Sequence, residues 1–360
     1  MANLDATLWN DIQSSNATNE KRFSQLGVVD LAADSTAAID FILPSDIERM
    51  NTLSSLRKPL FPVIKDQTVT VNSTPGFNFI PSNLPTTDQY TFVAYDVFSG
   101  LRHYPSAYAN NSVDGQYALQ QLMLNVAYAM GKAKEDILVT QLEARKTQVL
   151  SAGSLVAVSQ GDGAYTFNTS TDTLTVTKAA QKETMFFNLS ALMEANELGG
   201  NYRIVTTRGG LSVQKAEQLK YNVSNNKNLN ALGMFPLDQM YETAAISQGS
   251  DVFSGFIVRD GSFGFIPNFP NDFFIGTSFG AHSWSISDME LPFIRSRANI
   301  YVNKEATNAT SIVTTGTDSN LIMTHVQEMA IWDRFFVVYR YNSDLATRAN
   351  DIVKVVGATS

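Results

Sequence analysis

The 360-residue sequence contains no cysteine. It can therefore form no disulfide bond, and it offers neither a thiolate metal ligand nor a thiol nucleophile. Charged residues are also scarce, at 17% of the chain. A formal net charge of −8 argues against a basic surface of the kind that binds nucleic acid tightly. The polar surface is thus largely uncharged, which suits a β-rich protein or a subunit whose surface is covered by neighbours.

Long hydrophobic runs are absent as well. No apolar stretch reaches the roughly 18 residues that a transmembrane helix needs. The first residues, MANLDATLWNDIQSSN, do not combine a positively charged segment with an apolar one, as a signal peptide would. We therefore expect a protein made inside the cell, with no membrane partner. The apolar fraction of 44% is sufficient for a sizeable core, and the length allows two or three domains.

Histidine occurs three times, at His103, His282 and His325. None of the three has another histidine or a carboxylate at a spacing typical of metal ligands, so each is interpreted as a structural or surface residue. The glycine pairs Gly199-Gly200 and Gly209-Gly210 lack the spacing of a phosphate-binding loop. An anion at the second pair is conceivable because a helix follows it, but a simple strand-to-helix turn is favoured.

Two pairs of acidic residues are candidates for acid–base catalysis. Asp251 and Asp260 flank the segment FSGFIVR, and Glu135 and Asp136 are adjacent in a helical stretch. We interpret all four as solvated charges, because a catalytic pair requires a defined separation in space. The sequence thus predicts no catalytic, cofactor-binding or metal-binding residue, no cofactor, and a protein that is not an enzyme.

The most informative stretch is a predicted helix over residues 114–149. It has no proline, is rich in good helix formers, and would be about 50 Å long. Asp114 is expected at its N-cap, with Ser112 as an alternative, and Gly131 is where a bend is expected. Its predicted apolar stripe is Leu119, Leu122, Met123, Val126, Ala127, Met130, Ala133 and Ile137. Its polar residues are expected to lie mostly off that stripe, namely Gln120, Gln121, Asn125, Lys132, Lys134 and Glu135.

The segments before this helix predict an arm and a ribbon. Residues 1–42 are expected to be an extended, weakly structured arm that docks through scattered apolar residues. A capping box after Pro44 predicts a short helix through Ser55. Residues 60–105 contain strand-like pieces separated by proline- and glycine-rich turns, which indicates a two-stranded excursion. Such a ribbon is marginal alone in water and requires a partner surface.

The segments after the helix predict a mixed region and then a β region. Strands are expected within SLVAVSQGDGAYTF and TDTLTVT, in YRIVTT, in the phenylalanine-rich stretch up to residue 290, and at 298–302. Helices are expected at 182–198, ending at Gly199, and at 211–221. Residues 321–341 are rich in β-branched and aromatic residues and predict one long strand, although the first part could be helical.

The order of these parts resembles the major capsid proteins of tailed bacteriophages, which share the Hong Kong 97 phage-type capsid fold. Four local stretches are also similar to that family: NYRIVTT at 201–207, FGFIPNFP at 263–270, LPFIRSRANIYV at 291–302 and the ending WDRFFVVYRYNSDLATRANDIVKV at 332–355. The resemblance implies an α+β fold with an N-terminal arm at 1–58 and an E-loop at 59–112. It implies a peripheral (P) domain at 113–180 and 291–360, which includes the spine helix at 114–149, and an axial (A) domain at 181–290.

The resemblance also implies a function. A major capsid protein assembles with many copies of itself, as hexamers and pentamers, into the icosahedral head shell that encloses the viral DNA. It would be made and assembled in the bacterial host cytoplasm and would reside in the virion capsid, with scaffold, portal and cementing proteins as further partners. Contact with packaged double-stranded DNA is expected to be weak and non-specific. Some relatives cross-link a lysine to a neighbour's asparagine, but no motif marks Lys65, so that chemistry is not transferred.

Two other functions fit parts of the pattern. A virion or cell-surface adhesin could bind a receptor or carbohydrate through the β-rich half, although the long mid-chain helix argues against it. A nanocompartment subunit of the same fold would enclose cargo enzymes instead of DNA. The apolar face of the long helix is expected to pack on Phe335 to Tyr339, with the polar face turned into the shell.

Overall fold

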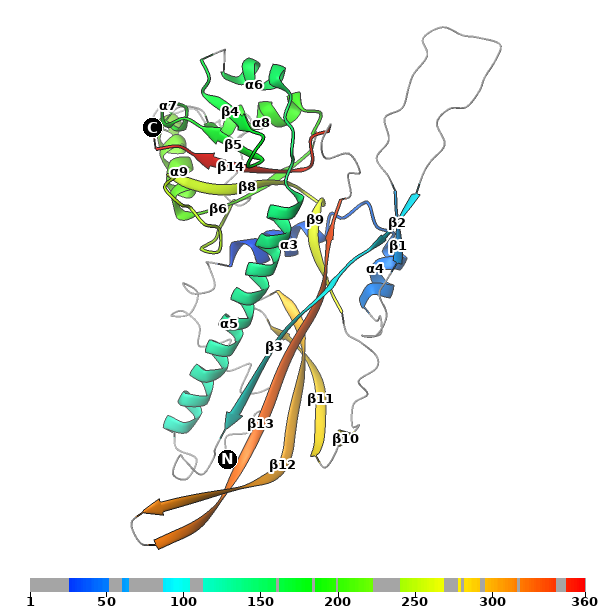
Figure 1. Ribbon diagram of the computed structural model, residues 1–360, viewed down its shortest axis with the longest axis vertical. Helices are drawn as coiled ribbons and strands as arrows, with labels where there is room; N and C mark the ends of the chain where they lie inside the picture. Colours follow the sequence, from blue (N-terminus) through cyan, green and yellow to red (C-terminus); the bar gives the residue numbers. More distant parts are fainter. Residues whose placement is uncertain are drawn as a thin grey trace, which may run out of the picture.

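The computed structural model describes residues 26–51, 60–64, 87–103, 113–159, 162–182, 185–198, 200–222, 240–268, 278–279, 282–291, 295–315, 318–340 and 348–359. The molecule is long, with one sheet and its helices at one end and a second sheet running along a long helix to the other end (Figure 1). A separate two-stranded ribbon leaves the body beside the upper sheet. The α+β class expected from the sequence is confirmed.

The helices are α3 (Gly27–Thr36), α4 (Pro44–Asn51), α5 (Val113–Arg145), α6 (Ala152–Ser159), α7 (Lys178–Gln181), α8 (Met185–Ala195) and α9 (Arg208–Asn222). The strands before α6 are β1 (Leu60–Ile64), β2 (Thr87–Thr91) and β3 (Ala94–His103). The later strands are β4 (Tyr165–Asn168), β5 (Thr173–Val176), β6 (Tyr202–Thr206), β7 (Met240–Glu242), β8 (Phe253–Arg259), β9 (Phe263–Pro267), β10 (Ser278–Phe279), β11 (His282–Leu291), β12 (Ser296–Thr315), β13 (Asp318–Tyr339) and β14 (Ile352–Gly357).

The sheet beside the long helix, called here the long sheet, has the order β10-β11-β12-β13-β3 and is antiparallel. Its central strand β13 changes partners along its length. On one edge it pairs with β12 as far as Trp332, and β9 takes over that role from Phe335. The expected strands at 298–302 and 321–341 are confirmed, and the helical alternative for the start of the latter is wrong because backbone pairing begins at Asp318.

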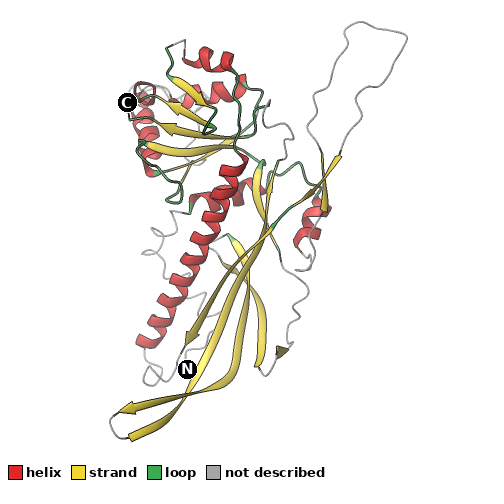
Figure 2. Cartoon of the chain, in the orientation of Figure 1, coloured by secondary structure: helices red, strands yellow, loops and turns green. Residues whose placement is uncertain are grey.

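The helix α5 packs on one face of the long sheet (Figure 2). It runs without interruption from Val113 to Arg145, so the long helix is confirmed and its predicted end at Val149 is four residues too far. Asp114 lies in the first turn rather than at an N-cap, and Ser112 is outside the described residues. The expected packing on 335–339 is confirmed, because Phe335, Val337 and Tyr339 share a core with α5.

The apolar stripe of α5 differs from the prediction at several positions. Leu122 and Ala133 are exposed, whereas Leu124 is buried. The larger error concerns two charged residues that were expected off the stripe, since Lys134 and Glu135 are 0% and 1% exposed. The remaining members of the buried face are Met123, Ala127, Met130, Leu138 and Leu142. The helix continues through Gly131, where a bend was expected, without a break.

The other sheet, called here the upper sheet, has the order β4-β5-β14-β8-β6-β7 and mixes parallel and antiparallel pairs. The last strand of the chain, β14, lies between β5 and β8 near its middle. One face packs under α6, α8 and α9 in a single apolar core. Its opposite face, through Val205, Phe256 and Val258, joins the core formed by α3, α5 and the long sheet.

The N-terminal part is more ordered than predicted. Residues 27–36, expected to be extended, form the buried helix α3. Val28, Val29, Leu31 and Ala32 are all 0% exposed, because this helix packs against α5, β9 and the edge of the upper sheet. The short helix after Pro44 is confirmed as Pro44–Asn51, and residues 52–55 lie outside the described ranges. The arm before Leu26 also lies outside them.

Two predictions between α5 and β6 need correction. Residues 154–159, expected to be a strand, form the helix α6, which packs its half-buried Leu155 and Val158 on the upper-sheet core. The strands at 165–168 and 173–176 are confirmed. The helix α8 ends at Ala195 rather than at Gly199, because Glu197 adopts a φ of 61° and the Leu198 N–H bonds back to Met193 O at 3.1 Å.

Strand pairing brings together residues that the expected division places in different domains. Residues 352–357, assigned to the P domain, form β14 in the upper sheet. Residues 263–267, assigned to the A domain, form β9 and pair with β13. Residues 94–103, assigned to the E-loop, form β3, an edge strand of the long sheet. The chain therefore crosses between the two sheets more often than a linear division suggests.

Candidate assembly surfaces and the joint between the sheets

Two projections leave the body as two-stranded ribbons. The first is β1–β2, which pairs from Leu60 opposite Thr91 to Ile64 opposite Thr87 and forms a sheet of two strands. The second is the distal part of the β12–β13 hairpin, where 307–315 pair with 318–326. Among the described strands, none other pairs with this distal part, since β11 ends its pairing at Asn303 and β3 at Gln327. In Figure 1 the β1–β2 ribbon lies at the side of the upper half of the molecule, and the distal hairpin forms its lower end.

The outer face of the long sheet, away from α5, carries an exposed aromatic patch. Phe98 on β3 is 67% exposed and lies directly opposite Trp332 on β13. Asp96 fixes this patch, because its Oδ1 accepts a hydrogen bond from Trp332 Nε1 at 2.9 Å and lies 3.8 Å from Arg334. Aromatic residues and arginine are enriched at the centres of protein interfaces. This patch is defined here as Asp96, Phe98, Trp332 and Arg334.

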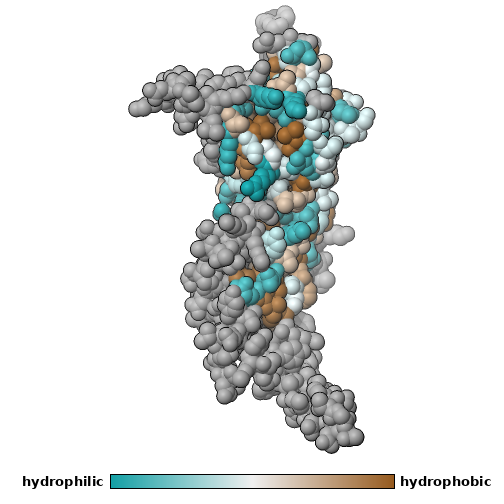
Figure 3. All heavy atoms as spheres, turned by 90° about the vertical axis from the view of Figure 1, so that its left-hand side faces the viewer, coloured by the Kyte–Doolittle hydropathy of each residue, from teal (hydrophilic) through white to brown (hydrophobic). Residues whose placement is uncertain are grey.

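The opposite side of the molecule has a different character. Seen from the side on which α5 lies, the described hydrophobic atoms form small groups among hydrophilic ones (Figure 3). The exposed positions of α5 are mostly polar or small, including Asn125, Ala129, Lys132, Ala133 and Asp136. Scattered exposed apolar atoms of this kind are normal on protein surfaces and mark no site by themselves.

The joint between the two sheets is built around α3. Its N-terminus lies against the end of β7, where Leu26 bridges Thr243, and its C-terminus meets the β8–β9 turn. There Ser35 Oγ accepts a hydrogen bond from the Gly261 N–H at 2.9 Å, and Thr36 Oγ1 accepts one from the Phe265 N–H at 3.1 Å. The helix is therefore bonded at both ends to strands that belong to different sheets.

A polar network extends from α3 across the same joint. Arg203 of β6 donates two hydrogen bonds to the Asp260 carboxylate, at 3.0 and 3.3 Å, and one to the Tyr241 hydroxyl at 2.7 Å. Tyr241 in turn donates to Asp34 on α3 at 2.6 Å. Desolvation and the bond to Asp34 raise the pKa of Tyr241 to about 12. Arg295, beside β12, reaches α3 by a 3.2 Å hydrogen bond to Asp30.

Glu135 supplies a buried contact in this joint. Its Oε1 accepts hydrogen bonds from the backbone N–H of Val28, at 3.2 Å, and from the Thr243 hydroxyl, at 2.5 Å. Val28 lies in the first turn of α3, where backbone N–H groups have no partner within the helix. The N-cap residue Leu26 provides no side-chain cap, so the glutamate from α5 takes that role. Burial raises the pKa of Glu135 to about 7, despite the lowering effect of both hydrogen bonds.

The neighbouring Lys134 fixes α5 on the long sheet. Its Nζ lies 3.1 Å from Asp333 Oδ2 on β13, and the two side chains are 0% and 1% exposed. The ammonium also lies over two aromatic rings, 3.7 Å from the Phe265 centroid and 4.5 Å from that of Phe335. Desolvation lowers the pKa of Lys134, while Asp333 opposes that shift. This pair sets which turn of the helix faces which residue of the strand.

The C-terminal segment holds the other end of α5. The Asn350 side-chain amide donates to Arg145 O at 2.5 Å, and the Thr147 N–H donates to Ile352 O at 2.7 Å. These bonds satisfy groups at the end of the helix and direct the chain away from it, which explains why α5 stops before Val149. In the last turn of α5, Glu143 also accepts a hydrogen bond from Lys354 on β14. The long helix is thus attached to the upper sheet through β14.

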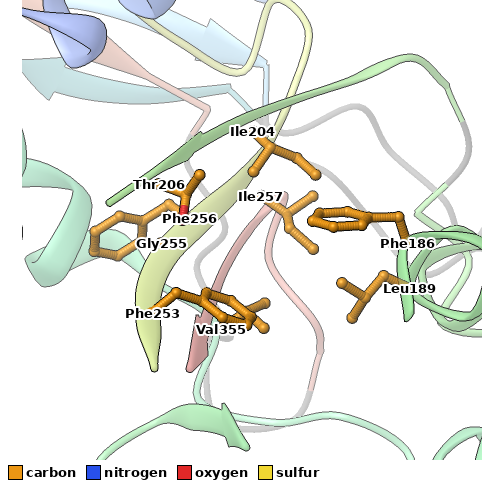
Figure 4. Close-up of a pocket in the computed structure, with 9 residues that line it drawn as sticks. All are labelled: Phe186, Leu189, Ile204, Thr206, Phe253, Gly255, Phe256, Ile257 and Val355. Carbon is orange, nitrogen blue, oxygen red and sulfur yellow. The ribbon is translucent and has the colours of Figure 1, made fainter. Parts of the chain in front are cut away.

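A small void lies inside the upper sheet's core, between the sheet and α8 (Figure 4). Its volume is about 10 Å³, enough for one water-sized sphere. Ligand pockets are typically hundreds of cubic ångströms. The void is therefore a packing gap. It is lined by Phe186, Leu189, Ile204, Thr206, Phe253, Gly255, Phe256, Ile257 and Val355.

The residues considered for catalysis are not brought together. Asp251 and Asp260 lie beyond opposite ends of β8, a strand of seven residues, and hence roughly 20 Å apart. The interpretation of Asp260 and Glu135 as solvated charges is wrong, because the first is paired with Arg203 and the second is buried. Asp136 is exposed, as expected, and Asp251 is half-buried.

The glycine pair Gly209-Gly210 has a packing role. Both residues lie in the first turn of α9, which begins at Arg208 and not after the glycines. A Cβ at Gly209 would lie 2.1 Å from Val252 O, and one at Gly210 would lie 2.1 Å from Thr206 Oγ1. The helix therefore packs against the upper sheet at a distance that only glycine permits.

The described part of the chain holds neither a cluster of metal ligands nor a membrane-spanning helix. No group of three or more histidine, aspartate or glutamate side chains there is placed to hold a metal ion. None of its helices combines the length and apolar character needed to cross a membrane. His103, His282 and His325 lie at or near strand ends or within strands of the long sheet, at separate positions along it.

Sequence reasoning missed the buried pair Lys134–Asp333, although a signal for it exists. Lys134 lies four residues after Met130 and four before Leu138, both buried on α5. Asp333 alternates with Ile331 and Phe335 on the buried face of β13. Opposite charges at positions that the helical and strand periods assign to the core predict a buried ion pair.

Comparison with known proteins gives similarity to solved structures alone. No protein-family profile and no curated protein matches the sequence. The structure is similar to the capsid of the cyanophage P-SCSP1u, with 9% identity, a TM-score of 0.44 and coverage of 89% of this chain and 90% of that one. It is also similar to the head structure of Helicobacter pylori bacteriophage KHP40, with 9% identity, a TM-score of 0.42 and coverage of 84% and 85%. A third similar structure is the SrpI encapsulin of Synechococcus elongatus PCC 7942, with 8% identity, a TM-score of 0.35 and coverage of 88% of both chains.

Proposed function

We propose that this chain is the major capsid subunit of a tailed bacteriophage, with the Hong Kong 97 phage-type fold, and that many copies of it form an icosahedral shell around the viral DNA. In this assignment α5 is the spine helix, β1–β2 is the base of the E-loop, the long sheet belongs to the P domain and the upper sheet belongs to the A domain. The chain has a structural role and no catalytic one.

One observation supports this proposal: two two-stranded ribbons leave a body with a stiff helix along it, one at the side of its upper half and one at its lower end. A two-stranded ribbon is marginally stable in water because each strand leaves one edge and both faces without partners. Two ribbons that point in different directions can both be stabilised if each packs on a different neighbouring copy of the chain. Such head-to-tail contacts close into rings and shells.

The aromatic patch gives this assembly a second contact. Phe98 exposes two thirds of its surface on β3, the strand into which the β1–β2 ribbon leads. The ribbon and two residues of the patch, Asp96 and Phe98, therefore belong to one segment, from Leu60 to His103 in the described ranges. Interfaces between subunits concentrate their binding energy in a few aromatic and arginine side chains of this kind.

The remaining partners follow from the same assignment. The net charge of −8 predicts weak, non-specific contact with packaged double-stranded DNA, since counterion release requires clustered lysine and arginine. Scaffold, portal and cementing proteins, and assembly in the host cytoplasm, are part of the proposal by resemblance to the phage family. Hexamers and pentamers are the expected capsomers.

The adhesin alternative is less well supported by the architecture. A β-rich binding domain packs its sheets on one another, whereas here α5 covers the long sheet and α6, α8 and α9 cover the upper one. A nanocompartment subunit of the same fold makes the same kind of shell, and the contents of the particle distinguish it from a capsid. Purified particles that hold cargo protein and no DNA during infection would favour the nanocompartment.

The test removes the chain between β1 and β2, keeps that pair of strands and leaves the long sheet intact. Ile64 pairs with Thr87, so replacement of 65–86 by Asn-Gly closes β1 and β2 with a two-residue turn. This change is sharper than removal of 60–105, which would also delete the edge strand β3. We expect a folded, monomeric or capsomer-sized protein that forms no shells by electron microscopy and sedimentation velocity. Normal shells from the shortened chain would contradict the proposed role of the E-loop, of which β1–β2 is the base.

A further inference from the structure

Glu135 joins three elements that are far apart in the sequence. It lies on α5, its Oε1 accepts from Val28 on α3, and the same oxygen accepts from Thr243 just after β7. The side chain is 1% exposed in a joint where α3 packs against α5, β6, β7 and β9. If α3 left this joint, Val28 and the bridge of Leu26 to Thr243 would leave with it, and water would reach the carboxyl.

The two charges that shift the pKa of this carboxyl share its sign. They belong to Asp136 on α5 and Asp30 on α3, and both disfavour its ionised form. The other charged or titratable groups of the joint are Asp34 on α3, Lys134 on α5, Arg203 on β6, Tyr241 and Glu242 on β7, Asp260 after β8, and Arg295 beside β12. Of these, Lys134 is paired with Asp333, and Arg203 and Arg295 are paired with aspartates of the same network.

We propose that the docking of α3 on α5 is a proton-linked latch in which Glu135 takes up a proton when the helix closes over it. In the closed state the neutral carboxyl still accepts the bonds from Val28 and Thr243, and no charge is buried. In the open state the carboxyl is hydrated and ionises as an ordinary glutamate does. Acidification therefore holds the N-terminal segment on the body, and alkaline conditions loosen it.

The direction follows from linkage. The pKa of Glu135 is raised from 4.5 to about 7 in the closed state, so the closed state binds more protons between these two values. The stabilisation is fully present below pH 4.5, decreases as the pH rises, and is lost above about pH 7. Burial also raises the pKa of Asp30, which adds a contribution of the same sign.

The absence of cysteine makes a direct measurement possible. A single Ala32→Cys reporter, at a position that is 0% exposed on α3, is labelled only when the latch opens. The labelling rate is divided by that of Ala144→Cys, an exposed position on α5, which cancels the pH dependence of the thiol itself. A third reporter, Ala180→Cys in the upper-sheet core, detects global unfolding.

We expect the corrected labelling of Ala32→Cys to rise on the order of fiftyfold from pH 5 to pH 8, while that of Ala180→Cys stays flat. Glu135→Gln, which keeps an acceptor but cannot ionise, should abolish most of this rise. Should that variant fold poorly, Thr243→Val provides the second test, because loss of a bond that lowers the pKa of Glu135 should move the rise to higher pH. A flat profile in the unmodified background, or an unchanged profile in Glu135→Gln, would overturn the latch. Equal rises at positions 32 and 180 would also overturn it, since the opening would then be global.

Discussion

The two sheets of this protein differ in how their faces are covered. The upper sheet is buried on both faces, by α6, α8 and α9 on one side and by the shared core with α3 and α5 on the other. The long sheet is covered by α5 along one face. On its outer face, α4 and the residues before it bury Ile266, Phe336 and Val338, whereas farther along β3 Phe98 has two thirds of its surface exposed. The central hairpin of the long sheet also continues as a ribbon of two strands beyond all its neighbours in the described part of the chain.

This difference separates what one chain can stabilise from what requires neighbours. Both faces of the upper sheet are covered by other elements of the same chain. The long sheet has an internal side, fixed to α5 by apolar contacts and by the Lys134–Asp333 pair, and an external side that the described residues of α4 cover beside β9 but not at Phe98. In the proposed shell, the external side and the ribbons are completed by other subunits.

The largest expected effect concerns the inner side of the long sheet. Asp333→Asn leaves the buried Lys134 ammonium without a counter-charge, so we expect a loss of about 3–5 kcal/mol in the free energy of unfolding, measured by denaturant titration. The double variant Lys134→Met with Asp333→Leu should recover most of that loss, because it removes both charges. A single variant as stable as the parent would show that the inner side is not fixed by this pair.

A smaller effect is expected within the upper sheet. A Cβ at Gly255 would lie 2.6 Å from Val205 O on the adjacent strand, so Gly255→Ala should cost about 1–3 kcal/mol. Gly153→Ala in α6 is the matched control, because nothing lies within 4 Å of its Cβ position and alanine favours a helix. Thermal unfolding should show opposite shifts for the two variants. Equal shifts would mean that the upper sheet is packed less tightly than its geometry indicates.

The connection between α5 and the upper sheet should contribute less. Lys354 on β14 bonds to Glu143 on α5, and the two side chains are 19% and 34% exposed. A pair with this much solvent contact is worth at most about 1 kcal/mol, and Lys354→Met should therefore lower the free energy of unfolding by no more than that. The loss should shrink further in high salt. A loss above about 2 kcal/mol would show that this ion pair, and not β-sheet pairing and α3, holds α5 on the upper sheet.

Substitution on the outer side of the long sheet should have the smallest effect on stability. Its effect on assembly should be large. Phe98→Ser removes an exposed side chain, so the free energy of unfolding should change by less than about 0.5 kcal/mol. Shell yield should nevertheless fall. Val156→Ser is the matched control, because Val156 is 59% exposed on α6 and belongs to the self-contained region. Normal assembly of the Phe98 variant would show that the patch is not a subunit contact.

The elements with strong periodicity could be predicted from the sequence. The long helix, the long strand β13 and the hairpin it forms follow from residue types and spacing that act locally. Residues 154–159 show the limit of this reasoning, since an apolar run of that length fits a strand or a helix, and its packing on the upper-sheet core decides for the helix.

The joint could not be predicted in the same way. Glu135 and Val28 are 107 residues apart, and no local pattern links a glutamate on one helix to the N-terminus of another. The expectation that residues 27–36 are extended failed for the same reason, because their order depends on burial against α5 and β9. The position of β14 in the middle of the upper sheet is likewise a long-range pairing with β5 and β8.

The central claim is that the long sheet and its ribbons are completed by other copies of the chain. Its most direct test is electron microscopy of the purified full-length protein, together with sedimentation velocity, across a range of concentrations and with a co-expressed scaffold. The account predicts thin-walled closed particles or capsomer rings whose fraction rises with concentration. A monomer that stays folded and never assembles under any of these conditions would contradict it.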